Sequence, residues 1–150
     1  MKESPESKKL EEVLRSSKLV AGGFMGGDNR SVSEIISTDA GELSKLGYSI
    51  EEIVRRMQEI TDDAIKALGN WIDIDEKLRA VVEEAKGPLV CPWPHPGGYD
   101  KRVTTVEIKE TGESIFWSDL NIHLIAKHSF FEGKGSAFRV EPKKLVDVIF

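Results

Sequence analysis

The sequence of 150 residues has a single cysteine, few aromatic residues and no long hydrophobic run. One cysteine cannot form an internal disulfide, so nothing indicates an oxidising compartment. No apolar stretch is long enough to cross a bilayer, and the charged N-terminal residues lack the hydrophobic region of a secretory signal. Together these absences predict a cytoplasmic protein that does not enter a membrane.

Excess positive charge is absent as well. The chain has 21 Lys and Arg against 26 Asp and Glu, which gives a formal net charge of −5. Binding to a phosphate backbone needs clustered Lys and Arg. The composition therefore argues against nucleic acid as a partner.

The length fits one domain that can bury a core without disulfides or a metal. We predict a single α+β domain over residues 1–150, with a helical part at about 8–68 and a β-rich part at about 70–150. The character of the chain changes near Gly69, where a subdomain boundary is the alternative. No linker rich in Pro, Ser or Gly marks that boundary, so the sequence leaves open whether the two parts share one core.

Two capping signatures predict a helical hairpin in the first part. Ser31 with Glu34 and Ser49 with Glu52 both fit the S-x-x-E pattern. Apolar residues at helical spacing follow the second signature as far as Leu68, and a two-residue link between the helices indicates that they pack side by side. The residues expected on the buried face of the first of these helices are Ile36, Ala40 and Leu43.

The second part has the pattern of an antiparallel meander. Strands are expected at residues 71–74, 78–83, 87–91, 102–110 and 114–117, with a hairpin turn centred on Gly112. A helix should begin at Ser118 and end at about residue 129 to 131, and Pro142 should open a last helix. Helices, a mostly antiparallel meander and C-terminal helices in this order indicate an α+β fold.

A proline-rich arm, Cys91–Tyr99, is the most unusual stretch of the chain. Its three prolines fix the backbone and remove donors, and two glycines then allow a bend. A rigid loop of this kind suits His95 to ligand contact or proton transfer. The alternative is a structural crossing in which Trp93 fills the core.

All three histidines and the only cysteine lie between residues 91 and 128. Cys91, His95, His123 and His128 offer the thiolate and imidazole ligands that zinc prefers, and H-x4-H is a known ligand spacing. A C-x2-C pair is missing, however. At about 100° per residue, the last two histidines also diverge by about 140° on a regular helix, so both can bind one ion only if the helix ends or distorts between them.

Each of these residues has a simpler interpretation. Cys91 is either a small buried residue or a thiolate nucleophile with His123 or His128 as its base. His128 is expected to face the core as a hydrogen-bonded histidine, and His123 to lie on a more polar edge. If the site is catalytic, His95 or His123 is the general acid–base group.

A glycine-rich loop precedes the capped helix at Ser31. Paired glycines followed by Asp28, Asn29 and Arg30 resemble an anion cradle at a helix N-terminus, and Arg30 adds a fork-shaped donor. Arg139 is the second candidate for holding an anion. Neither common nucleotide-binding motif is present, so a plain glycine-rich connector is the alternative.

The sequence thus predicts a binding site for a small polar or anionic ligand around the Cys91–Tyr99 arm, and it does not decide whether the site is catalytic. The alternative is a non-catalytic interaction or structural module, with zinc as its cofactor and a homodimer formed through the helix at 50–68. The residues expected to bind the ligand are Trp93, Asp28, Asn29, Arg30 and Arg139.

Overall fold

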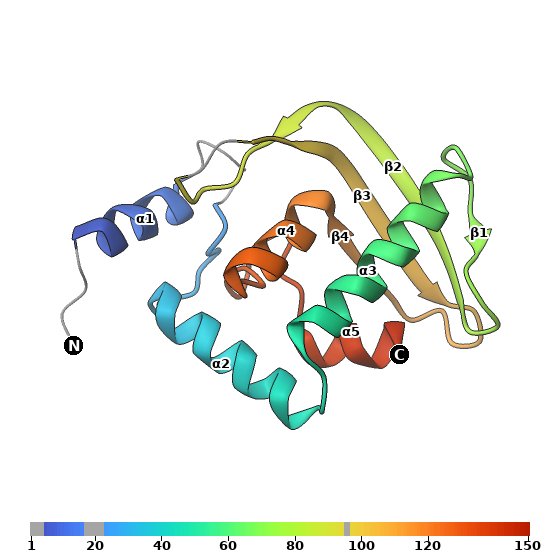
Figure 1. The fold of residues 1–150 in the computed structure, drawn as a ribbon, viewed down its shortest axis with the longest axis horizontal. Coiled ribbons are helices and arrows are strands. Elements are labelled where there is room, and N and C mark those ends of the chain that lie inside the picture. Colours follow the sequence, from blue (N-terminus) through green and yellow to red (C-terminus); the bar gives the residue numbers. More distant parts are fainter. Residues whose placement is uncertain (1–4, 17–22, 95–96) are drawn as a thin grey trace.

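A computed structural model describes residues 5–16, 23–94 and 97–150. The fold is α+β, as predicted: helices come first, then a four-stranded antiparallel sheet, then helices again (Figure 1). Within the described residues, none of the helices is both long and apolar enough to span a membrane. The helices are α1 (Pro5–Arg15), α2 (Val32–Lys45), α3 (Ile50–Ile65), α4 (Asp119–His128) and α5 (Pro142–Ile149).

Capping side chains fix where the first long helices begin, as predicted. The Ser31 hydroxyl accepts the Glu34 N–H at 3.2 Å at the start of α2, and Ser49 forms a complete capping box with Glu52 at the start of α3. Helix α3 ends at Ile65, before the predicted limit. Leu68 has a left-handed φ of 52° and is 89% exposed, so the apolar pattern continued past the end of the helix.

The sheet is a simple meander with strand order β1-β2-β3-β4. Its strands are β1 (Ile72–Asp73), β2 (Leu78–Leu89), β3 (Tyr99–Ile108) and β4 (Ser114–Ser118). The two separate strands predicted at 78–83 and 87–91 are wrong, because β2 runs through both. Its pairing with β3 shifts register between Glu84 and Pro88, and this irregularity accommodates a proline that cannot donate to the ladder.

One hydrophobic core joins the helical part to the sheet. Helices α3, α4 and α5 pack on the same face of the sheet (Figure 1). A buried polar contact completes the junction: Trp117 Nε1 donates to Thr61 Oγ1 at 2.9 Å, and Thr61 is 3.0 Å from Thr104 Oγ1. The core residues include Ile53, Met57, Ile60, Leu78, Val82, Val106, Trp117, Ile125 and Leu145.

The buried face of α2 differs from the expected one. Ala40 is exposed and Ile36 only partly buried, whereas Ile35 and Asp39 are buried beside Leu43. The reason is an ion pair between Asp39 and a distant arginine, described below, which turns a charged residue inward.

Strands β2 and β3 extend beyond the rest of the sheet. Strand β4 pairs only with Val103–Glu107, so the far ends of β2 and β3 form a two-stranded ribbon that leads to the Cys91–Tyr99 arm (Figure 1). The arm contacts a second hydrophobic cluster. Its buried members are Leu14, Phe24, Met25, Ile35, Cys91, Leu120, Leu124 and Phe130.

Candidate metal centre

Helix α4 positions the two described histidines. Its N-cap is Ser118, whose backbone N–H donates to Asn121 Oδ1 at 2.8 Å while its hydroxyl accepts the Asn121 N–H at 3.0 Å. It ends at His128, because Ser129 takes a left-handed φ of 53°. His128 is therefore the last helical residue, on the side of α4 where the arm arrives.

Cys91, His123 and His128 come together at this helix end. Cys91 Sγ lies 3.6 Å from His128 Nε2, and the two imidazole rings meet edge to face with centroids 5.3 Å apart. One ligand atom from each residue lies within 4.8 Å of the other two. The prediction that the two histidines diverge is thus wrong: their imidazole rings are in contact, because their side chains reach toward each other at the end of the helix.

Aromatic residues of the arm hold both imidazoles in place. The Tyr99 hydroxyl lies 2.7 Å from His123 Nδ1, and their rings stack with centroids 4.4 Å apart. Trp93 stacks on His128 at 4.0 Å and meets the edge of Phe130 at 5.5 Å. Trp93 thus anchors the arm to α4, and Tyr99 contacts His123 through its Nδ1.

The electrostatics of the cluster favour a thiol unless a cation is present. Burial raises the pKa of Cys91, which is 4% exposed. Burial also raises the pKa of Tyr99, with the nearby Cys91 as a second cause. A thiol with a raised pKa is a poor nucleophile, whereas a metal ion deprotonates a coordinating thiol. The raised pKa therefore disfavours a free thiolate in the absence of a cation, and the use of Cys91 as a nucleophile with His128 as its base, 3.6 Å away, stays a prediction.

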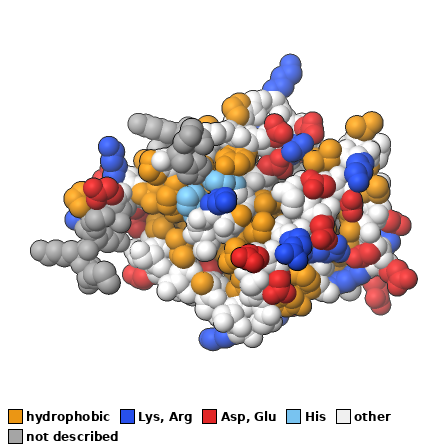
Figure 2. Space-filling model, viewed as in Figure 1, with side chains coloured by type: hydrophobic (Ala, Val, Ile, Leu, Met, Phe, Trp, Pro, Cys, Tyr) orange, Lys and Arg blue, Asp and Glu red, His pale blue; other side chains and the backbone are white. Residues whose placement is uncertain are grey.

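The cluster is accessible from one side. A hollow of about 370 Å³ is lined by Tyr99, His123, Lys127 and His128. Figure 2 shows the histidines at the surface among hydrophobic side chains and next to a cationic one. His95, the favoured residue of the sequence analysis, lies outside the described residues together with Pro96, so its role stays a prediction.

The Asp28–Arg30 loop is held by internal bonds. Arg30 Nη2 donates to Asp28 Oδ2 at 2.6 Å, and the same carboxylate accepts the Lys134 N–H at 3.1 Å. The hydrogen bond from Arg30 holds the pKa of Asp28 well below its usual range. Arg15 bonds the carbonyls of Asp28 and Arg30 at 2.6 and 2.9 Å, and Asn29 is exposed. These contacts close the loop, and its predicted anion binding stays a prediction.

Arg139 is also engaged with other residues of the chain. It pairs through both terminal nitrogens with Asp39, and its Nη1 donates to the Glu132 carbonyl at 2.8 Å. Its Nε donates to Glu141 Oε1 at 3.1 Å. The guanidinium thus links α2 to the segment before α5, and its expected contact with an anion stays a prediction.

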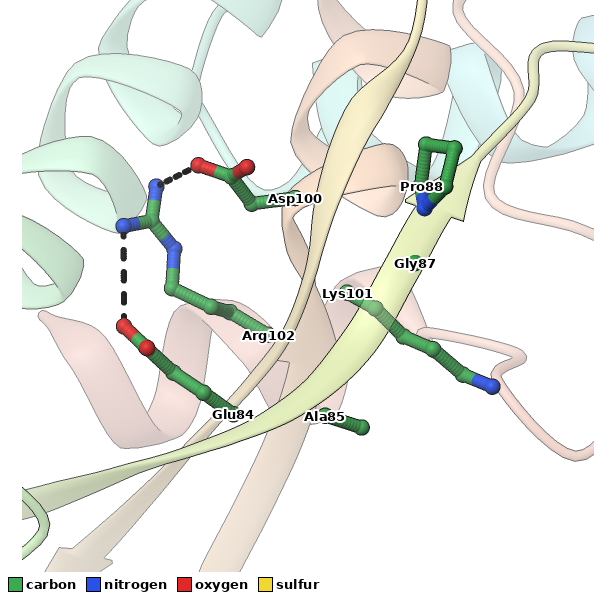
Figure 3. A pocket seen from close by; sticks show the side chains of 7 residues that line it. All are labelled: Glu84, Ala85, Gly87, Pro88, Asp100, Lys101 and Arg102. Atoms are coloured by element: carbon green, nitrogen blue, oxygen red, sulfur yellow. Dashed lines mark ion pairs between the residues drawn. The ribbon is translucent and has the colours of Figure 1, made fainter.

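A second hollow, of about 400 Å³, lies where the β2–β3 pairing shifts register (Figure 3). Arg102 points between Asp100 and Glu84, at 3.2 and 3.8 Å, and its strongest partner is Asp119 at 2.7 Å. Three carboxylates therefore already surround Arg102, the one arginine among the described residues that line this hollow. This charge balance makes the hollow a weaker candidate than the cysteine–histidine cluster.

Sequence reasoning gave no role to Glu132, a buried carboxyl behind α4. Its side chain accepts from Asn121 Nδ2 at 2.8 Å and from Ser136 Oγ at 2.5 Å. Burial raises its pKa to about 7 despite these bonds. Nothing in the local sequence marks this residue, because its partners belong to α4 and to the loop that follows.

We expect replacement of Glu132 by glutamine to change how stability depends on pH. The native pKa of about 7 lies above the ordinary 4.5, so native Glu132 keeps its proton where the unfolded chain loses it. The contribution of this protonated side chain to the free energy of unfolding is complete below about pH 4.5 and is lost as the pH rises to about 7. In urea unfolding, the free energy of unfolding of the variant should therefore rise relative to that of the native chain by roughly 3 kcal/mol across that interval. Parallel pH curves would contradict the expectation.

Comparisons of the chain with protein-family models, with curated proteins and with solved structures give no match.

Proposed function

We propose that the protein binds one zinc ion through Cys91, His123 and His128. The observation that carries the proposal is the convergence of one thiol and two imidazoles, with ligand atoms within 4.8 Å of one another. Thiolate and imidazole are the ligands typical of zinc in proteins. Structural zinc sites are closed by four protein ligands, whereas catalytic sites have three protein ligands and an open position.

The distances support this choice. Zn–S of about 2.3 Å and Zn–N of about 2.0 Å place the sulfur and nitrogen ligands of a tetrahedral ion about 3.5 Å apart. Cys91 Sγ and His128 Nε2 already lie 3.6 Å apart. Closing the remaining separation to His123 needs a movement on the order of 1 Å, which rotation of an imidazole can supply.

The surroundings also suit a ligated histidine. A metal-bound imidazole usually bonds through its other nitrogen to a fixed partner, which orients the ring. The Tyr99 hydroxyl holds this position at His123 Nδ1, at 2.7 Å. A thiolate ligand persists in a reducing compartment, which agrees with the proposed cytoplasmic location. The homodimer remains a separate proposal, which light scattering across a dilution series would test.

Zinc binding is tested on chelator-treated protein by titration against a chromogenic competitor. We expect one equivalent per chain, with binding abolished by Cys91→Ala and strongly weakened by His128→Asn. Lys101→Met, at a lysine in the wall of the other hollow, is the control and should leave zinc binding unchanged. Binding should weaken as the pH falls, because protons compete for the thiolate and imidazoles.

Thermal unfolding supplies a second measurement. Zinc at 100 times its dissociation constant should stabilise the native chain by about 2.7 kcal/mol, and this gain should vanish in Cys91→Ala. His95→Ala tests whether that residue is a fourth ligand, as the sequence suggests. Unchanged zinc affinity in both Cys91→Ala and His128→Asn would refute the proposed site.

A further inference from the structure

The hollow beside the cluster lies where a ligand of the metal would enter. Of the four residues that line it, His123 and His128 are proposed zinc ligands, while Tyr99 and Lys127 are not. Zinc takes four ligands, and where a protein supplies three, the fourth position holds water or substrate. Within the described residues, the chain brings three metal-ligating side chains together here.

The charges around this position favour an anion. Zinc bound to one thiolate and two neutral imidazoles keeps one net positive charge. Lys127 adds an ammonium group at the rim of the hollow, where its side chain is exposed. An anion entering the hollow thus meets positive charge from the metal and from the lysine.

Tyr99 offers a hydrogen-bond donor at the same place. When His123 binds a metal through Nε2, its Nδ1 carries the proton and donates to the Tyr99 oxygen, 2.7 Å away. The hydroxyl then keeps its own proton for another acceptor. The position of Tyr99 in the wall of the hollow allows that acceptor to be an atom bound to the metal.

We infer that the fourth position of this centre takes a small carboxylate. One carboxylate oxygen coordinates the metal, while the Tyr99 hydroxyl and the Lys127 ammonium bind the anion from the rim. The inference rests on the proposed zinc function, and it assigns to that site the class of ligand that the sequence left open. A hollow of about 370 Å³ has room for a small organic acid.

Cobalt-substituted protein tests the inference, since the visible spectrum of Co²⁺ reports both its thiolate ligand and its coordination number. We expect a thiolate-to-cobalt band on loading and a saturable change of the d–d bands on titration with acetate. Lys127→Met should weaken acetate binding about two- to fivefold without changing cobalt stoichiometry. Lys101→Met, a lysine in the wall of the other hollow, is the matched control and should change neither.

The outcomes separate the two proposals. Absence of a thiolate-to-cobalt band would refute the metal site itself. A normal band with no response to acetate would overturn the carboxylate inference and leave the metal site standing. A response to acetate that appears only in His95→Ala would show that His95 fills the fourth position, and this would also overturn the inference. Equal acetate affinity in Lys127→Met and in the native chain would overturn it as well.

Discussion

Replacement of Asp39 by alanine should lower the free energy of unfolding by roughly 3–5 kcal/mol, the usual cost of removing one partner from a buried ion pair. Arg139 and Asp39 side chains are 7% and 5% exposed, and both carboxylate oxygens accept from the guanidinium. The variant leaves the arginine charge buried without its main counterion. Because the pair joins α2 to the segment before α5, the loss acts on the whole fold.

Urea unfolding of the metal-free protein measures this effect. Asp147→Ala is the matched control: its carboxylate pairs with Lys143 at 2.7 Å, but the two side chains are 49% and 66% exposed, so the cost should stay below about 1 kcal/mol. Apolar replacement of both partners, Asp39→Leu with Arg139→Met, should recover part of the loss. Equal costs for Asp39→Ala and Asp147→Ala would contradict the prediction.

Replacement of Gly26 by alanine should destabilise the chain by roughly 2–5 kcal/mol. Gly26 has a left-handed φ of 56°, and a Cβ there would lie 2.3 Å from the Ser136 nitrogen and 2.4 Å from the Gly135 carbonyl carbon. Both obstacles are backbone, so the clash cannot be relieved by turning a side chain. Two segments 110 residues apart, each rich in glycine, cross here at a distance that only glycine permits.

The neighbouring Gly27 supplies the control. A Cβ on Gly27 meets nothing within 4 Å, and its φ is not in the left-handed region, so Gly27→Ala should be nearly neutral or slightly stabilising. Urea midpoints of the two variants give the comparison. Gly26→Ala should also weaken zinc binding, because Phe24 and Met25 pack in the same cluster as Cys91. A neutral Gly26→Ala would refute the close crossing.

Features governed by local sequence were predictable from the chain. The capping box at Ser49, the turn at Gly112 and the helix start at Ser118 involve residues within three positions of one another. The α+β class followed from the order of such segments. The predicted break of strand β2 between residues 83 and 87 is wrong, because these residues form an irregular part of a continuous β2–β3 pair.

The candidate site depended on contacts that no local pattern contains. The sequence named Cys91, His123 and His128 as ligands, but a regular helix separates the two histidines, and only the end of α4 beside the arm brings their rings together. The placement of Tyr99 and Lys127 beside the histidines could not be predicted for the same reason, because it depends on the contact between the arm and α4. Asp39 was assigned to no buried face, because its partner, Arg139, lies 100 residues further along the chain.

The ribbon formed by the far ends of β2 and β3 has a consequence for the dynamics of the site. All six β2 residues from Glu83 to Pro88 are solvent-exposed, and a two-stranded ribbon is marginally stable in water by itself. Contacts of Cys91, Trp93 and Tyr99 attach its tip to α4, and Arg102 pairs with Asp119 nearer to the sheet. An ion bound there would cross-link the tip of the ribbon to the helix and suppress its local unfolding. Occupancy of the centre and order of the ribbon would then be thermodynamically linked, so removal of the ion would favour local opening of the ribbon without abolishing the Trp93 and Tyr99 contacts.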